Sequence, residues 1–182
     1  MKIKSFLKLV EIQTKVASVI PFFVGVAFTV YNFGSLNVLN TVVMFAAMLI
    51  FDMTVTAANN LFDYKRAVKK HGYNYEVHNS IVQYGLKENR VLALIIFMFV
   101  LSAALGVYLV YLTDYIVLIL GVICFGIGIL YSYGPLPISR TPFGEIFSGG
   151  IMGFFIPLIT IYINILDEGI IKLALDGHML LG

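Results

Sequence analysis

The chain has 182 residues, of which 60% are hydrophobic and only 12% are charged. Soluble domains carry about 25% charged residues, so this composition argues against a water-soluble globule. The formal net charge of +2 gives no reason to expect a nucleic-acid partner, and the single cysteine, Cys124, excludes an intramolecular disulfide. The composition therefore predicts a membrane protein surrounded by a lipid bilayer.

The first predicted element is the N-terminal arm, residues 1–15. Its apolar residues recur at helical spacing and form one face, while most of its charged residues lie off that face. This pattern is typical of an amphipathic helix lying at the membrane interface. A helix that binds a partner is the alternative. The apolar face consists of Ile3, Phe6, Leu7 and Val10.

Five later stretches are long and apolar enough to cross a bilayer, which takes roughly 17–25 residues. They predict an all-α fold, a polytopic membrane helix bundle of about five transmembrane helices, in a single membrane domain over 1–182. Gly149 and Gly153, four residues apart in the last stretch, predict a close helix contact there. The five stretches are 16–33, 39–58, 91–112, 115–132 and 146–166.

Lys and Arg gather on one side of these predicted spans. The arm has four of them, the loop after the second span has six and the loop after the fourth has one, which is 11 of the 12 in the chain. Cytoplasmic loops are the ones that carry this excess. We therefore expect a multi-pass protein of the cytoplasmic membrane, with the cation-rich loops in the cytoplasm.

A stripe of polar residues begins inside the second span and extends beyond its cytoplasmic end. At about 100° per residue, its four members fall within roughly 60° of one another on a helix. A carboxylate inside a span is costly, so it should face a cavity or the interior of the bundle. The stripe consists of Asp52, Thr56, Asn59 and Asp63, and Arg66 and Lys70 extend it if the helix continues.

This stripe has the chemistry of a diphosphate site. Mg²⁺ is usually held through one or two carboxylates, and substrate phosphates supply further ligands. The amide of Asn59 is another hard oxygen donor, and the cations behind it would hold the remaining phosphate oxygens. We therefore predict a cytoplasm-facing site with Mg²⁺ bound by Asp63, Asn59 and Asp52. The alternative is a polar helix end that only solvates its terminus.

The sequence "NNLFDYKRA" resembles the first Asp-rich motif, Asn-Asp-x-x-Asp-x-x-x-Asp, of the UbiA superfamily of intramembrane prenyltransferases. Asn59 matches its first position and Asp63 its central aspartate. Asn60 and Ala67 stand where the motif has aspartates, and both are departures from it. The letters "DYKR" look most like the menaquinone-pathway members, which prenylate dihydroxynaphthoate.

Two further stretches carry the same resemblance. "YSYGPLPISRTPFGEIFSG", residues 131–149, is similar to the loop after the fourth helix of those enzymes. "LVEIQTKVASVIPFFVG" is similar to their first helix, in which a basic residue corresponds to Lys15. Tyr131 and Tyr133 are candidates to stabilise an allylic cation by cation–π attraction, with interfacial anchoring as the alternative.

The resemblance implies an enzyme that uses Mg²⁺ to transfer a polyprenyl group from its diphosphate to an aromatic quinone precursor. Asp63 and Asn59 would be its catalytic residues. The further residues that we expect to contact the diphosphate or another part of the substrate are Lys15, Asn60, Arg66, Lys70, Tyr131, Ser132 and Arg140.

The superfamily typically has nine spans and a second Asp-rich motif after the sixth, which these 182 residues do not contain. We therefore expect the N-terminal portion of such an enzyme, inactive alone and completed by a companion C-terminal half or by a homo-oligomer. Two other functions stay open. One is a non-catalytic membrane protein, either a decayed half-enzyme or an isoprenoid-binding scaffold. The other is a small cation-coupled transporter.

Overall fold

The protein is a bundle of helices. The computed structural model describes residues 2–66, 79–133, 138–141 and 144–166, and no strand occurs in these ranges. The elements are α1 (Ile3–Leu9), η1 (Ile12–Lys15), α2 (Val16–Phe33), α3 (Val38–Arg66), α5 (Ser80–Gln83), α6 (Glu88–Leu112), α7 (Tyr115–Ser132), η2 (Ile138–Arg140) and α8 (Gly144–Tyr162), of which η1 and η2 are 3₁₀ helices.

The long helices are of membrane-spanning size, which confirms the predicted polytopic helix bundle. Four helical segments in the described ranges are long and apolar enough to cross a bilayer, and the apolar segment of α8, Met152–Tyr162, is shorter. Many large apolar side chains on them are exposed, as expected of surfaces that face lipid tails. The four segments are Ile12–Phe33, Val38–Lys65, Glu88–Leu112 and Tyr115–Ser132.

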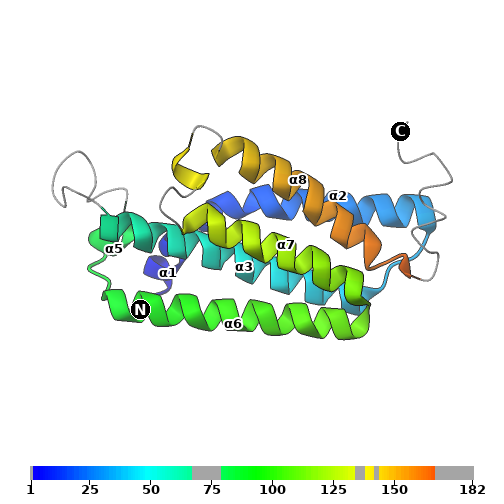
Figure 1. The fold of residues 1–182 in the computed structure, drawn as a ribbon, viewed down its shortest axis with the longest axis horizontal. Helices are drawn as coiled ribbons and strands as arrows, with labels where there is room; N and C mark the ends of the chain where they lie inside the picture. Colours follow the sequence, from blue (N-terminus) through cyan, green and yellow to red (C-terminus); the bar gives the residue numbers. More distant parts are fainter. Residues whose placement is uncertain (1, 67–78, 134–137, 142–143, 167–182) are drawn as a thin grey trace.

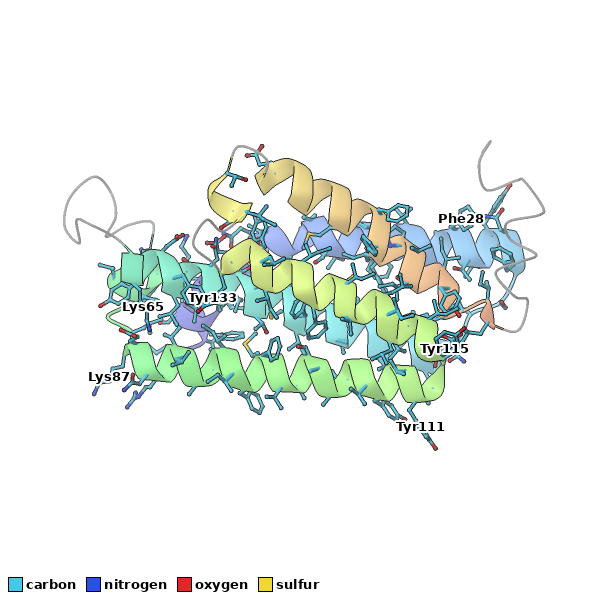
Figure 2. All side chains as sticks on the ribbon, viewed as in Figure 1. Phe28, Lys65, Lys87, Tyr111, Tyr115 and Tyr133 are labelled. Atoms are coloured by element: carbon cyan, nitrogen blue, oxygen red, sulfur yellow. The ribbon has the colours of Figure 1, made fainter. Side chains whose placement is uncertain are left out.

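The two ends of the bundle differ in chemistry. Figure 2 shows Lys65 and Lys87 at one end and the rings of Tyr111 and Tyr115 at the other. At the first end, Lys65 Nζ lies 2.5 Å from a carboxylate oxygen of Glu88, which joins the last turn of α3 to the first turn of α6. Lysines and exposed tyrosines are both typical of the interfaces that border a bilayer.

Helix α3 packs most extensively against α6, and α2 packs against α8, while α7 contacts α3, α6 and α8 (Figure 1). Gly25 allows the contact between α2 and α8, because a Cβ there would lie 2.9 Å from Cβ of Thr160. The predicted close contact at Gly149 and Gly153 is wrong within the described part of the chain. Both are exposed, and an added Cβ at either would meet nothing within 4 Å.

The second predicted span, 39–58, is part of a longer helix. Helix α3 begins at Val38 and continues to Arg66, without a break where the sequence becomes polar. The polar stripe was expected to extend to Arg66 only if the helix continued that far, and α3 does so. The last two turns of α3 extend the helix beyond its most apolar stretch, which places polar side chains at the end of the bundle that carries Lys65.

The N-terminal arm is not the single helix that was predicted for residues 1–15. Helix α1 ends at Leu9, and Glu11 has a φ of 48°, in the left-handed region, before η1 begins. Ile3, on the predicted apolar face, is 79% exposed, whereas Leu9, which only flanks that face, is fully buried. The chain turns here because Leu9 packs into the bundle against α3 and its neighbours. Whether the arm lies at the membrane interface stays a prediction.

The end of the bundle near Tyr115 is closed by polar contacts. The hydroxyl of Tyr162 donates to the carboxylate of Asp114, which also caps the first turn of α7. Asn164 accepts hydrogen bonds from the backbone N–H of Asn37 at 2.7 Å and from the Thr41 hydroxyl at 3.1 Å. These contacts join the ends of α3, α7 and α8, so this end holds the helices at a fixed spacing.

Candidate functional site

A large cavity of about 770 Å³ runs through the bundle and is lined by side chains of α2, α3, α6, α7 and α8. Its body is apolar and reaches buried residues such as Leu109 and Val117 near the α6–α7 turn. Its other end is polar. The polar lining there consists of Glu11, Thr14, Lys15, Ser18, Asp52, Thr56, Asn59, Asn60 and Asp63. We call this end the mouth of the cavity.

All four residues of the predicted stripe line this cavity. Asp52, Thr56, Asn59 and Asp63 lie on the continuous helix α3, and each contributes to the cavity wall. The shared face that helical periodicity predicted is therefore confirmed. The roles assigned to these residues stay predictions.

The innermost member of the stripe is engaged in a buried ion pair. Lys15 Nζ donates to Asp52 Oδ1 at 2.6 Å and to Thr56 Oγ1 at 2.6 Å, and Ser18 Oγ donates to Asp52 Oδ2 at 2.7 Å. Lys15 is 4% exposed and Asp52 is 9% exposed. Both carboxylate oxygens of Asp52 thus already accept hydrogen bonds from protein groups, and the pair fixes the start of α2 against the middle of α3.

Asn60 lies on the neighbouring face of α3 and fastens the N-terminal arm to it. Its side-chain Nδ2 donates to the carbonyl of Leu9 and to Glu11 Oε1, both at 3.1 Å. Its backbone carbonyl accepts from Asn79 Nδ2 at 3.0 Å. The side chain is buried and also borders the cavity. Its observed contacts are those of a residue that positions the wall of the mouth.

Asn59 faces the segment that follows α7. Its side-chain oxygen accepts a hydrogen bond from Ser139 Oγ at 3.1 Å, across 80 positions of sequence. Asp63 lies one turn further along α3 and is half-buried in the cavity wall. The structure therefore brings η2, which lies within the predicted loop 131–149, against the stripe.

The three candidate residues at the end of α7 have different surroundings in the structure. Tyr131 lines the cavity. Ser132 is buried and donates to the carbonyl of Val55 at 3.1 Å, so it joins α7 to α3. Tyr133 is 59% exposed, its ring packs against Phe62, and it does not border the main cavity (Figure 2). Of the two tyrosines, Tyr131 is the one placed to face a cavity-bound ligand.

Three of the four predicted cationic residues lie at or beyond the ends of the described segments. Arg66 is the last residue of α3 and Arg140 is the last residue of η2, but their side chains lie outside the described part of the structure. Lys70 lies outside the described residues altogether. Their contact with a diphosphate stays a prediction.

The sequence reasoning missed Glu11, Thr14 and Ser18, which all line the mouth. Glu11 stands at the positive φ that ends α1, and this conformation is uncommon for a residue other than glycine. Thr14 Oγ1 donates to the carbonyl of Glu11 at 2.8 Å. An acidic residue within an arm of lysines was the available signal, but the helical pattern assigned it to solvent.

The charges of the mouth favour cations. Among the described lining residues, Lys15 is cationic and Glu11, Asp52 and Asp63 are acidic, which gives a formal net charge of −2. No group of three or more His, Cys, Asp or Glu in the described ranges is placed to hold a metal ion by itself. That is consistent with Mg²⁺, which binds through one or two carboxylates together with substrate phosphates. Asp63 and Asn59 offer the matching hard oxygen donors.

These features define a class of protein: a multi-pass helical membrane protein whose apolar cavity opens at a polar mouth that carries acidic residues. The profile of the UbiA prenyltransferase family matches residues 18–173, which is most of the chain. The chain belongs to this family.

One curated relative extends the comparison. Over 156 residues the chain is 32% identical to the 1,4-dihydroxy-2-naphthoate octaprenyltransferase of Bacillus subtilis (strain 168). The match covers 84% of this chain and 48% of the relative, so the chain spans about half the length of the relative that it matches. No solved structure matches the chain significantly.

Proposed function

We propose that the chain provides the diphosphate-binding part of an enzyme that transfers a polyprenyl group to an aromatic ring, with dihydroxynaphthoate as the acceptor. The observation that carries this proposal is the stripe of α3 at the mouth of an otherwise apolar cavity. A polyprenyl diphosphate has the same two parts, a polar head and an apolar tail. The naphthoate acceptor follows from the relative, whose name states that substrate.

Mg²⁺ is the cofactor that this mouth would need. A formal net charge of −2 on the described lining residues would repel a diphosphate that arrived without a cation. Asp63 and Asn59 would hold the metal. The buried ion pair of Asp52 with Lys15, supported by Ser18, would position α2 beside that metal. When bound, Mg²⁺ neutralises charge on the diphosphate and so favours its departure.

The remaining groups of the mouth would act around that centre. Tyr131 borders the cavity and could stabilise positive charge on the allylic carbon, an effect of about 0.5–2 kcal/mol. Ser139, hydrogen-bonded to Asn59, would fix the orientation of the amide. The apolar walls exclude water from the cation that forms. Arg66, Lys70 and Arg140 would bind the outer phosphate oxygens.

We place the mouth on the cytoplasmic side of the cytoplasmic membrane. The support is the distribution of cations in the sequence and the position of Lys65 and Lys87 at one end of the bundle (Figure 2). Because the relative is about twice the length of the match, we also propose that a companion half, or a second copy, completes the site for turnover.

The test is binding of a polyprenyl diphosphate to the purified chain in lipid nanodiscs, with and without Mg²⁺. Asp63→Asn should abolish the Mg²⁺-dependent part of binding, because a neutral amide cannot replace an anionic ligand. Glu88→Gln is the matched control, since Glu88 is a half-exposed acid that does not border the cavity. Equal affinity in the wild type and in Asp63→Asn would contradict the proposed site.

The alternatives predict other outcomes. An isoprenoid-binding scaffold would bind the ligand with Mg²⁺ but would stay inactive when the missing half is supplied. A cation-coupled transporter would move cations across the bilayer without any polyprenyl diphosphate, and its binding of that ligand would not depend on Asp63.

A further inference from the structure

Two glycines line the deeper part of the cavity, on either side of the turn between α6 and α7. Gly106 lies seven residues before Thr113, and Gly121 lies seven residues after Asp114. Because α6 and α7 are antiparallel helices joined at this turn, the two positions lie at a similar depth. Both residues are half-buried.

These glycines do not serve close helix packing. A Cβ added at Gly106 or Gly121 would meet nothing within 4 Å, whereas a Cβ at Gly128 would lie 2.5 Å from the ring of Phe51. Helix α7 thus contacts α3 at Gly128 but has open space beside it at Gly121. Neither glycine has a positive φ, and glycine is disfavoured inside a helix relative to alanine. What the two glycines provide is space.

That space lies well below the mouth. Ten residues of α7 separate Tyr131, at the mouth, from Gly121. At about 1.5 Å per residue this is a depth of roughly 15 Å. The cavity continues beyond it to Val117 and Leu109, which are buried. A geranyl tail anchored by its diphosphate at the mouth would end between the mouth and the two glycines. A long polyprenyl tail would extend past them into the deeper cavity.

We propose that Gly106 and Gly121 determine the length of prenyl tail that the site accepts, by keeping the deep part of the cavity open for the distal isoprene units. The inference rests on the proposed function, because it takes the diphosphate to be held at the mouth. Distal units that enter the deep cavity leave water or lipid for close contact with apolar walls. Side chains in place of the glycines would fill that volume and leave only the upper cavity.

The experiment compares Gly106→Leu and Gly121→Leu with the wild type in nanodiscs containing Mg²⁺. Each protein is titrated with geranyl diphosphate and with octaprenyl diphosphate, and each variant is compared with the wild type for the same ligand. We expect octaprenyl affinity to fall at least about tenfold, because several buried methylene and methyl contacts are lost, and geranyl affinity to change less than about twofold.

Gly153→Leu is the matched control. Gly153 is also a helical glycine whose added Cβ would meet nothing within 4 Å, but it does not border the cavity. It should leave both affinities unchanged. The milder Gly106→Ala and Gly121→Ala guard against misfolding of the leucine variants, and they should show a smaller loss in the same direction, for octaprenyl diphosphate only.

The outcomes separate the two proposals. If the wild type binds both ligands but the leucine variants lose both equally, or lose neither, the glycines do not determine tail length and the inference is wrong while the proposed function stands. If the wild type binds neither ligand in the presence of Mg²⁺, the proposed function fails and the inference fails with it.

Discussion

The contact between Lys15 and Asp52 shows how one residue's partner changes the role that its chemistry suggests. A carboxylate inside a membrane span is a candidate metal ligand, but both oxygens of Asp52 accept hydrogen bonds, from Lys15 and from Ser18. Lys15 in turn has Thr56 as a second partner. The pair therefore holds α2 against α3 beside the mouth, and this structural role differs from the metal-binding role that the sequence suggested for Asp52.

This arrangement predicts strong coupling between the two residues. Lys15→Met or Asp52→Leu alone should lower the free energy of unfolding by about 3–5 kcal/mol, because each leaves an uncompensated buried charge. The double variant should lose clearly less than the sum of the two. The measurement is a double-mutant cycle from unfolding in detergent. Additive losses would show that the two charges act independently.

At the scale of elements, the contacts of α8 depend on glycine position rather than on glycine spacing. Helices α2 and α8 approach each other closely at Gly25, where Thr160 and Pro157 of α8 lie against the glycine. The Gly149 and Gly153 pair, which has the expected spacing, faces open space. A small residue permits a close contact only where another helix is present to make it.

A pair of substitutions tests this difference. Gly25→Leu should destabilise the protein by about 1–3 kcal/mol, because its side chain would overlap the backbone of α8. Gly149→Leu should change the free energy of unfolding by less than about 0.5 kcal/mol, as for a substitution in open space. Unfolding of both variants in the same detergent gives the comparison. A larger loss for Gly149→Leu would mean that its face is covered.

The spacing of residues along one helix was predictable, and contacts between helices were not. The stripe of α3 followed from helical periodicity, and the membrane-spanning helices followed from the length and apolar composition of their stretches. The pairing of Lys15 with Asp52 joins positions 37 apart, and no local pattern states which residue faces which. Glu11 was missed because its backbone leaves the helix, and buried contacts of Leu9 decide that turn.

At the scale of the whole molecule, the cationic end of the bundle and the mouth of the cavity coincide. Lys65 and Lys87 lie at the end where α3 carries Asn59 and Asp63 (Figure 2). The orientation of the protein in the membrane therefore also determines the side from which a diphosphate enters the cavity.

Labelling of single cysteines tests the orientation of the protein in the membrane. In a Cys124→Ala background, a membrane-impermeant maleimide applied outside the cell should label Ser35→Cys and spare Asn74→Cys. The reason is that the second position lies in the cation-rich loop, which we expect in the cytoplasm. Labelling of position 74 with protection of position 35 would contradict both the orientation and the cytoplasmic mouth.

The half-length match to the relative leads to a prediction about turnover. We expect the 182-residue chain to bind a polyprenyl diphosphate weakly with Mg²⁺ and to form no prenylated naphthoate, because ionisation needs a preorganised site closed to water. Co-expression with the unmatched half of the Bacillus subtilis relative should restore some product, measured by chromatography. Robust product from the 182-residue chain alone would contradict this expectation.

The buried ion pair also bears on how the nascent chain enters the membrane. An aspartate at the centre of a single helix costs about 2.5–3.5 kcal/mol during insertion by the translocon. Asp52 meets its counter-ion Lys15 at the end of η1, directly before α2 and 37 residues earlier in the sequence. Helices α2 and α3 should therefore leave the translocon together as a hairpin, and loss of Lys15 should reduce the fraction of α3 that inserts before any later helix has been synthesised.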